Sequence, residues 1–334
     1  MSAPRFDVLG IGNAIVDIIA RTEDDFILRE GLAKGSMRLI DSEEAERLYG
    51  HMPQAIEMSG GCAGNTAAGV ASFGGRAAFI GKVADDHLGG VYAHDIRAMG
   101  IHFATAPLGA GVAPTARSMI LVTPDGERTM NTYLGACQHL TEADIDATVV
   151  AATAITYLEG YLWDPPEAKK AFRRAAEIAH ANGREVAITL SDSFCVDRYR
   201  AEFLELIRSK TVDIVFANVA EVKALYETAD FDTAIAALRQ DAKLAAVTMS
   251  EKGSMVVTAD QAVAVPAQPV ETVFDTTGAG DLYAAGFLFG YSQGFELAMA
   301  AQFGGLAAAE IISHLGARPQ VALRGFAEQA GFTL

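Results

Sequence analysis

The fold is decided by the stretch Val273-Phe-Asp275-Thr-Thr-Gly278-Ala279-Gly280-Asp281, which an apolar run over 282–290 follows. This pattern predicts the end of a strand, a tight turn and then a helix. Glycines in the turn let backbone N–H groups approach an anion, and the N-terminus of the helix adds its positive end. An acid at this place suits a base that deprotonates a hydroxyl while the N–H groups stabilise a transferring phosphoryl group. The alternative is an N-cap aspartate beside two turn glycines.

The length and composition fit one large α/β domain with an added piece. The chain has 334 residues, and 51% of them are hydrophobic, which is ample for a core. The net charge of −16 argues against binding to nucleic acid or to an anionic membrane. A phosphate would therefore be bound by local N–H groups, a few basic side chains and a metal ion.

Nothing in the sequence predicts a membrane span, a secretory signal or a disulfide framework. No run reaches roughly 18 apolar residues, and polar residues interrupt the apolar stretch over 8–20. We therefore expect a cytoplasmic protein. Cys62, Cys137 and Cys195 are too few and too scattered for a disulfide framework or a zinc site, and we expect them to be small, mostly buried residues.

The order of predicted elements indicates a sheet with a lid. After residue 140 strands and helices alternate regularly, which is typical of a parallel sheet. Two excursions, about 16–50 and about 103–137, break this alternation. The second contains two alternating stretches, 117–123 and 128–134, around Pro124-Asp-Gly-Glu127, which predicts a hairpin. We expect residues 1–334 to form a single α/β domain whose small β lid is built from both excursions.

Polar residues gather where predicted strands end, which marks the ligand side of a parallel sheet. Asn13 and Asp17 follow the first strand, and Asn218 follows a later one. Gly60-Gly61 opens a helix of small residues that contains Asn65. An amide inside such a helix needs a hydrogen-bond partner, which close packing alone does not explain.

Asn218 and Glu221 are candidate ligands for Mg²⁺. At a spacing of three residues the two side chains share one face of a helix and offer oxygen atoms that suit Mg²⁺ held through water. The same spacing also describes a helix cap with a capping box. Residues 248–253 join a strand to a hairpin and are candidates for a nucleotide-binding rim, whereas a P-loop is excluded because no Walker A sequence occurs.

These motifs together resemble the ribokinase-like, or PfkB, carbohydrate kinase family. Residues 275–281 resemble its C-terminal signature, residues 60–81 its N-terminal signature, and Asn218-x-x-Glu221 its magnesium motif. The resemblance implies a three-layer α/β/α sandwich with a mostly parallel sheet and a small β-sheet lid. It also implies ATP-dependent phosphorylation of a primary hydroxyl, with Asp281 as the base and Gly278, Ala279 and Gly280 as the anion hole.

Within that family the chain is most similar to the adenosine-kinase branch. The resemblance then implies that the substrate is held by Asn13, Asp17, Gly60, Gly61, Asn65, Met130, Tyr161 and Phe194. The last two could stack on a purine or could be core aromatics. ATP would be bound by Arg128, Asn218, Thr248, Ser250, Gly253, Gly278 and Gly280. Ser250 departs from the glycine usual at its position, which puts the detailed triphosphate contacts in doubt.

We therefore expect an ATP- and Mg²⁺-dependent kinase for the 5′-hydroxyl of a nucleoside, with adenosine as the first choice. Members of the ribokinase branch also bind a monovalent cation near Asp275, so K⁺ is a further candidate. Ribose or a related sugar, inosine and guanosine stay open as acceptors, and so does a nucleoside-binding protein without catalysis. The expected partners are the nucleoside or sugar and ATP, and the expected assembly is a monomer or a homodimer.

Overall fold

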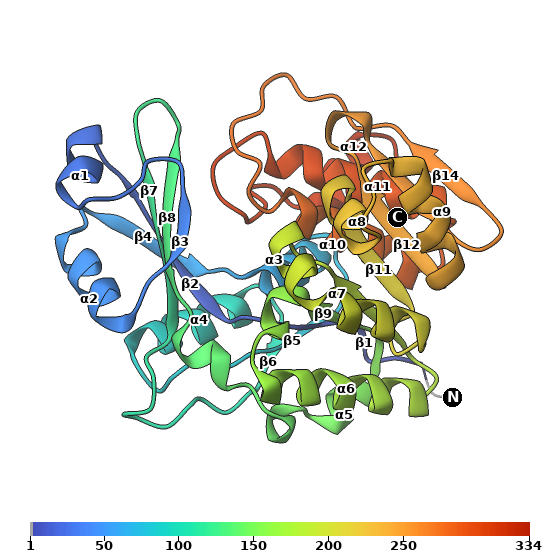
Figure 1. Cartoon of the computed structure of the whole chain (residues 1–334), viewed down its shortest axis with the longest axis horizontal. Coiled ribbons are helices and arrows are strands. Elements are labelled where there is room, and N and C mark those ends of the chain that lie inside the picture. Colours follow the sequence, from blue (N-terminus) through green and yellow to red (C-terminus); the bar gives the residue numbers. More distant parts are fainter. Residues whose placement is uncertain (1–2) are drawn as a thin grey trace.

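The computed structural model describes residues 3–334, and its strands form a large sheet and a small one. In Figure 1 the small sheet, labelled by β2, β3, β4, β7 and β8, stands to one side of the larger body. Nine strands of the described residues form the large sheet. From one edge of the sheet to the other they are β14 (Ala262–Val265), β13 (Ser254–Val257), β12 (Leu244–Thr248), β11 (Ile214–Asn218), β10 (Glu185–Thr189), β9 (Thr153–Glu159), β1 (Phe6–Ile11), β5 (Ala77–Ile80) and β6 (His102–Phe103).

The large sheet is mostly parallel. Strands from β12 to β6 pair in parallel, and only the hairpin of β13 and β14 runs antiparallel at one edge. Strand β1 is buried along its whole length and is apolar except for Asp7, as expected for a strand covered on both faces. The predicted α/β fold with a mostly parallel sheet is confirmed.

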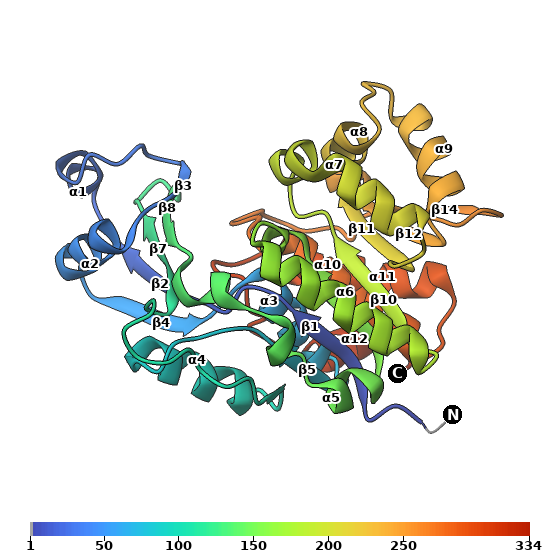
Figure 2. The same cartoon turned by 60° about the horizontal axis from the view of Figure 1, so that its bottom comes forward.

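Helices cover both faces of the large sheet and bury two separate cores (Figure 2). One face carries α3 (Cys62–Ser72), α4 (His87–Ala98), α10 (Ala279–Ser292), α11 (Leu297–Ile311) and α12 (Leu323–Gln329). The other carries α5 (Ala147–Ala151), α6 (Pro166–Ala181), α7 (Ser193–Arg208), α8 (Val219–Leu225) and α9 (Phe231–Asp241). Short 3₁₀ turns complete the connections: η1 (Gly135–His139), η2 (Glu142–Asp144), η3 (Gly160–Trp163) and η4 (Ser250–Lys252).

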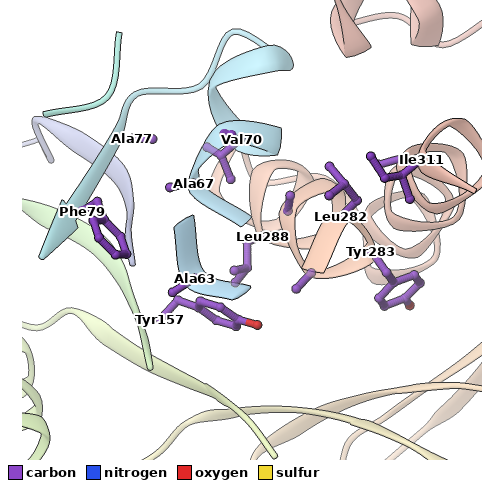
Figure 3. Close-up of a cluster of buried hydrophobic side chains, with 14 of the residues drawn as sticks. Ala63, Ala67, Val70, Ala77, Phe79, Tyr157, Leu282, Tyr283, Leu288 and Ile311 are labelled. Carbon is purple, nitrogen blue, oxygen red and sulfur yellow. The ribbon is translucent and has the colours of Figure 1, made fainter. Parts of the chain in front are cut away.

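Small residues bring α3, α10 and α11 into close contact. A Cβ atom on Gly69 would lie 2.5 Å from the Cβ of Ala285, and one on Gly286 would lie 2.3 Å from the carbonyl oxygen of Phe303. Figure 3 shows this apolar packing, with Ala67 and Val70 of α3 beside Leu282 and Leu288 of α10. The packing fixes the N-terminal ends of α3 and α10 next to each other.

The small sheet has the strand order β3-β8-β7-β2-β4. Its strands are β2 (Ile15–Arg21), β3 (Met37–Leu39), β4 (Ala55–Ser59), β7 (Ala116–Val122) and β8 (Arg128–Tyr133), and the helices α1 (Asp24–Arg29) and α2 (Ser42–His51) accompany it. The predicted hairpin is confirmed, since β7 and β8 pair antiparallel from Arg117–Tyr133 to Val122–Arg128. Strand β4 and helix α1 are not apparent from the sequence, because both are short and neither has a regular apolar period.

None of the helices within residues 3–334 is both long and apolar enough to cross a membrane.

Candidate active site

Polar residues meet at the carboxyl edge of the large sheet, beside the small sheet. The register places Ile11 opposite Leu158, and Thr189 opposite Glu159, so the ends of β1, β9 and β10 are level. Asn13 comes shortly after β1, and Glu159 ends β9. Because parallel strands direct their carboxyl ends to one edge, this is where an open α/β sheet binds its ligand.

The N-terminus of α10 has the geometry that suits an anion. Gly278 is its N-cap and adopts a left-handed conformation with φ of 79°, which glycine tolerates without strain. A Cβ atom at this position would also lie 2.9 Å from the Cβ of Ala317. Nothing lies within 4 Å of the Cβ position of Gly280, so that side of the turn is open. The N atom of Ala279 donates to the Thr276 carbonyl at 3.2 Å. The first N–H groups of a helix lack carbonyl partners inside it, so the open side of this turn suits an anion.

Asp281 lies in the first turn of α10 and is bound by α3. The Nδ2 of Asn65 donates to Oδ2 of Asp281 at 2.9 Å, and the hydroxyl of Thr66 donates to the Asp281 carbonyl at 3.1 Å. Burial raises the pKa of Asp281 to about 6, against hydrogen bonds from Asn65 and Cys62 and the charge of Arg318. A carboxylate with this pKa is largely ionised at neutral pH and accepts a proton readily.

Asp17 points from the small sheet toward the same region. Burial raises its pKa to about 6, Arg318 and Arg128 oppose the increase, and the charge of Asp281 adds to it. The carboxylate lies against Gly60, where a Cβ atom would come within 2.3 Å of Oδ2. Gly61 is equally constrained, since its Cβ would lie 2.1 Å from the carbonyl oxygen of Asn13. The glycine pair therefore permits Asp17 and Asn13 to approach the start of α3.

Arg128 connects the small sheet to the turn before α10. Its guanidinium forms an ion pair with Asp275 at 2.6 Å and donates to the Thr277 hydroxyl at 2.8 Å. Both ends of the ion pair are nearly buried, at 10% and 4% side-chain exposure. Within residues 3–334 the Nε and Nη2 atoms of Arg128 are buried without a hydrogen-bond partner. Two unused donors next to an anion-binding turn fit a negatively charged ligand.

Glu159 is a central residue of the site that the sequence analysis misses. Its carboxylate accepts hydrogen bonds from the backbone N of Asn13 at 3.2 Å, from Nδ2 of Asn13 at 2.7 Å and from the N of Ala63 at 3.0 Å. Burial raises its pKa to about 7, and these donors oppose the increase. The stretch Tyr157-Leu-Glu159 reads as a buried strand, and a carboxylate at the last position of such a strand is the signal that could have identified it.

Two further side chains close to Asp281 were also missed. Burial raises the pKa of the Cys62 thiol well above its usual range, and the nearby charge of Asp281 adds to this. The thiol therefore stays protonated next to Asp281, which goes beyond the buried packing residue expected from the sequence. Arg318 follows α11 and lies near both Asp17 and Asp281, but no pattern in its surroundings distinguishes it from a surface arginine.

Asn218 and Glu221 form a complete capping box at the start of α8. Oδ1 of Asn218 accepts from the N of Glu221 at 3.0 Å, and Oε2 of Glu221 accepts from the N of Asn218 at 3.0 Å. The amide of Asn218 also donates to Oε1 of Glu221 at 2.5 Å. Burial raises the pKa of Glu221 to about 7. Because these oxygen atoms already serve the cap while Asn218 is exposed, the pair fits a metal ion held through water better than a directly bound one.

The candidate nucleotide rim lies at the ends of β12 and β13. Thr248 ends β12 opposite Asn218, and Ser250 adopts a left-handed φ of 52°. Gly253 has φ of 94°, and a Cβ atom there would lie 2.1 Å from the carbonyl oxygen of Val265. A cavity of about 270 Å³ opens beside Ser250, lined by Val219, Lys223, Phe231, Met249, Ser250, Glu251 and Lys252.

The residues predicted to flank a base are accessible to different degrees. Phe194 is 79% exposed at the start of α7, so it is not a core aromatic. Tyr161 is half-buried and is positioned by Ser191, whose hydroxyl accepts from the Tyr161 N at 3.0 Å. Met130 lies in β8 of the small sheet, opposite Ile120 and Met37, and is half-buried.

A family profile matches most of the chain. The profile of the pfkB family carbohydrate kinases covers residues 33–322, which include β3, β4, β7 and β8 of the small sheet and the turn at Asp281. The chain belongs to the pfkB family. This pfkB protein is therefore a kinase, a phosphotransferase that uses ATP and an alcohol acceptor, and the expected family is confirmed.

Solved structures extend this similarity to the whole pfkB chain. An adenosine kinase from Sinorhizobium meliloti is 62% identical, with a TM-score of 0.90, over 98% of this chain and 99% of that one. A probable sugar kinase protein from Rhizobium etli CFN 42 is 56% identical, with a TM-score of 0.91 and the same coverage. Fructokinase-1 of Oryza sativa subsp. japonica is 30% identical over 242 residues, 71% of this chain and 74% of the fructokinase.

Proposed function

We propose that the protein transfers the γ-phosphoryl group of ATP to the 5′-hydroxyl of adenosine and forms AMP. The observation that carries this proposal is the position of the Asp281 carboxylate, in the first turn of α10 and bound to Asn65 at 2.9 Å. A base for a hydroxyl thereby lies within an anion-binding turn. The 62% identity to an adenosine kinase over nearly the whole chain supports adenosine as the acceptor.

The ribose would be held between the small sheet and α3. Asp17 and Asn65 offer a carboxylate and an amide, and Oδ1 of Asn65 is buried without a hydrogen-bond partner in residues 3–334. Asn13 likewise has a buried, unpartnered Oδ1, and its amide nitrogen is fixed by Glu159. These oxygens would accept hydrogen bonds from ribose hydroxyls, so that the 5′-hydroxyl is directed toward Asp281.

Asp281 would accept the proton of the 5′-hydroxyl during transfer. Its pKa of about 6 is close enough to neutrality for proton transfer and low enough to keep most molecules ionised. The N–H groups of Gly278, Ala279 and Gly280 would stabilise the negative charge that develops on the phosphoryl group. Arg128 would contribute its two unused donors, Nε and Nη2, to the same charge.

Asn218 and Glu221 would hold Mg²⁺ through water, and the ion, when bound, would neutralise charge on the phosphate groups of ATP. Thr248, Ser250 and Gly253 would border the nucleotide, next to the cavity beside Ser250. K⁺ near Asp275 stays a prediction. In the present structure the Asp275 carboxylate is already bound by Arg128 and by the backbone N atoms of Thr277 and Gly316.

Tyr161 and Phe194 would bind the faces of the purine. The large exposed area of Phe194 is what a ring that becomes covered by ligand requires, since an aromatic side chain gains from removing its apolar face from water. Met130 would complete the acceptor site from the small sheet, where it is carried on the same strand as Arg128.

A sugar is the second candidate acceptor, because a probable sugar kinase protein and a fructokinase are among the similar proteins. The test follows ATP consumption with adenosine, inosine, guanosine, ribose and fructose, and identifies the phosphorylated product. We expect adenosine to give AMP, and 5′-deoxyadenosine to give no phosphorylated product because it lacks the accepting hydroxyl. Ribose or fructose turning over far better than adenosine would overturn the proposed acceptor while leaving the kinase intact.

A further inference from the structure

Arg318 lies in a segment that touches several parts of the site. The segment over 312–322 connects α11 to α12. Within it, the N of Gly316 donates to Oδ2 of Asp275 at 3.1 Å, and Ala317 packs against Gly278. Both contacts support the turn before α10. The next residue, Arg318, extends away from that turn toward the small sheet and α3.

The guanidinium of Arg318 binds two different elements through uncharged acceptors. Nε donates to the carbonyl of Ser59 at 3.0 Å, Nη2 to the Ser59 hydroxyl at 3.0 Å, and Nη1 to the Gly64 carbonyl at 2.5 Å. Ser59 is the last residue of β4, and Gly64 lies in the first turn of α3. Arg318 therefore joins the small sheet to the helix that carries Asn65.

Ser59 is held firmly on its other side. Its backbone N and its hydroxyl both donate to Oδ2 of Asp95 in α4, at 2.8 Å and 2.6 Å. Ser59 also pairs with Val16 and is followed by Gly60, against which the Asp17 carboxylate lies. A displacement of Ser59 would consequently move Asp17 relative to Asn65 and Asp281.

The charge of Arg318 is not neutralised by a direct ion pair in the described residues. The ionisable groups whose charges act on it are Tyr92 and Asp95 from α4, Asp17 from β2 and Asp281 from α10. Around the two site carboxylates, the other ionisable groups are Arg128 from β8, Tyr157 and Glu159 from β9, and Cys62 from α3. Burial lowers the pKa of Arg318, but an arginine stays charged in this environment. One positive charge thus faces three carboxylates, of which Asp17 and Asp281 belong to the proposed site.

We propose that Arg318 is a positioning residue for phosphoryl transfer, which joins the end of β4 to the first turn of α3 and supplies a positive charge that Asp17 and Asp281 share. The proposal builds on the proposed roles of these two carboxylates. Because opposite charge favours the ionised form of an acid, the pKa values of both are held lower by Arg318 than burial alone would set them. The base would thereby be available at a lower pH.

The test measures kcat/KM against pH for the wild type, Arg318→Met and Arg318→Lys. In the pH profile of kcat/KM, we expect the acidic limb of Arg318→Met to lie about one pH unit higher than that of the wild type. Activity at high pH should be partly retained. Arg318→Lys should keep the limb near its wild-type position, because the charge stays. The KM of Arg318→Lys for the acceptor should rise by about ten-fold, because one ammonium group cannot replace the guanidinium that donates hydrogen bonds to both Ser59 and Gly64.

The matched control is Arg324→Met, because Arg324 lies on α12, is about half exposed and pairs with the neighbouring Glu328. It should leave both the limb and KM unchanged. A purely structural role would lower the activity of Arg318→Met equally at every pH, and that result would overturn the proposal. If Arg318→Met does not fold, Arg318→Gln replaces it as the neutral variant: an acidic limb at higher pH than that of Arg318→Lys supports the proposal, and equal limbs for the two variants overturn it.

The pH comparison is made with whichever acceptor the wild type phosphorylates best. A failure of adenosine as acceptor therefore leaves the test of Arg318 intact.

Discussion

Asn65 and Asp281 are separated by 216 residues in the chain, and a 2.9 Å hydrogen bond joins their side chains. Each lies in the first turns of a helix, and the close packing of α3 on α10 brings the two helix N-termini together. The amide nitrogen of Asn65 thereby has a hydrogen-bond acceptor, and the acid at the start of α10 is held in place. This contact links the proposed ribose site to the proposed base.

Asn65→Ala removes a donor to the Asp281 carboxylate. A hydrogen bond to the ionised form lowers the pKa of an acid, so its loss should raise the pKa of Asp281 above about 6. The acidic limb of kcat/KM should move to higher pH, and kcat/KM at neutral pH should fall by about ten-fold or more. Asn182→Ala, a change at the C-cap of α6, is the control. An acidic limb at the same pH in Asn65→Ala and the wild type would show that this hydrogen bond does not set the pKa of Asp281.

Asp17→Asn should make the protein more stable at pH 8. The folded state holds the pKa of Asp17 near 6, above its ordinary value of 3.8, so the folded state binds the proton more tightly. The stability that this group contributes is complete below about pH 4 and is lost as the pH rises through about 6. Asparagine does not ionise, so the free energy of unfolding of Asp17→Asn at pH 8 should be higher by up to about 3 kcal/mol, which corresponds to about two pKa units.

Urea unfolding at pH 8 and at pH 4 measures this effect of Asp17→Asn. The gain should be present at pH 8 and nearly absent at pH 4, and Asp232→Asn, on the exposed side of α9, should change neither value. An equal gain at both pH values would exclude ionisation of Asp17 as its cause.

Arg128→Met should weaken ATP use and destabilise the fold together. It removes two donors for the phosphates and leaves the Asp275 carboxylate buried without its ion-pair partner, which typically costs about 3–5 kcal/mol. KM for ATP should rise by about ten-fold or more. The double variant Arg128→Met/Asp275→Asn separates the two effects, because it should recover stability but not ATP use. Recovery of both would mean that Arg128 acts only on Asp275.

Phe194→Ala should affect adenosine without affecting stability. The side chain is 79% exposed, so the free energy of unfolding should change by no more than about 0.5 kcal/mol. Loss of a stacking partner for a base is worth about 1–3 kcal/mol, and KM for adenosine should rise by about five- to a hundred-fold. Leu28→Ala, which alters a similarly exposed residue of α1, is the control. An unchanged KM for adenosine would remove Phe194 from the proposed base site.

Local patterns predict those parts of the molecule in which neighbouring residues carry the signal. The hairpin of β7 and β8 is predicted because turn residues separate two alternating stretches, and the parallel sheet because strands and helices alternate. Helix α10 is predicted because an apolar run follows a turn with two glycines, whereas the strand predicted to end before that turn is wrong: residues 273–277 form no strand. In each case residues close in sequence determine the element that they form.

The remaining features depend on contacts between distant residues. Glu159 reads as part of a buried strand, and only its hydrogen bonds to Asn13 and Ala63 reveal its place in the site. Arg318 has no local signal, because its acceptors lie more than 250 residues earlier in the chain. Strand β4 forms because β2 offers a partner edge, which its own five residues do not indicate.

The conversion of adenosine and ATP into AMP by the wild type and by Asp281→Asn tests the central claim most directly. Asparagine preserves the shape of the side chain but cannot accept the proton of the 5′-hydroxyl. We predict that the wild type forms AMP and that kcat of Asp281→Asn is about 10²- to 10⁴-fold lower, with little change in adenosine binding measured by calorimetry. Asp260→Asn, in an exposed turn, should be as active as the wild type. Unchanged turnover in a correctly folded Asp281→Asn variant would contradict the assignment of Asp281 as the base.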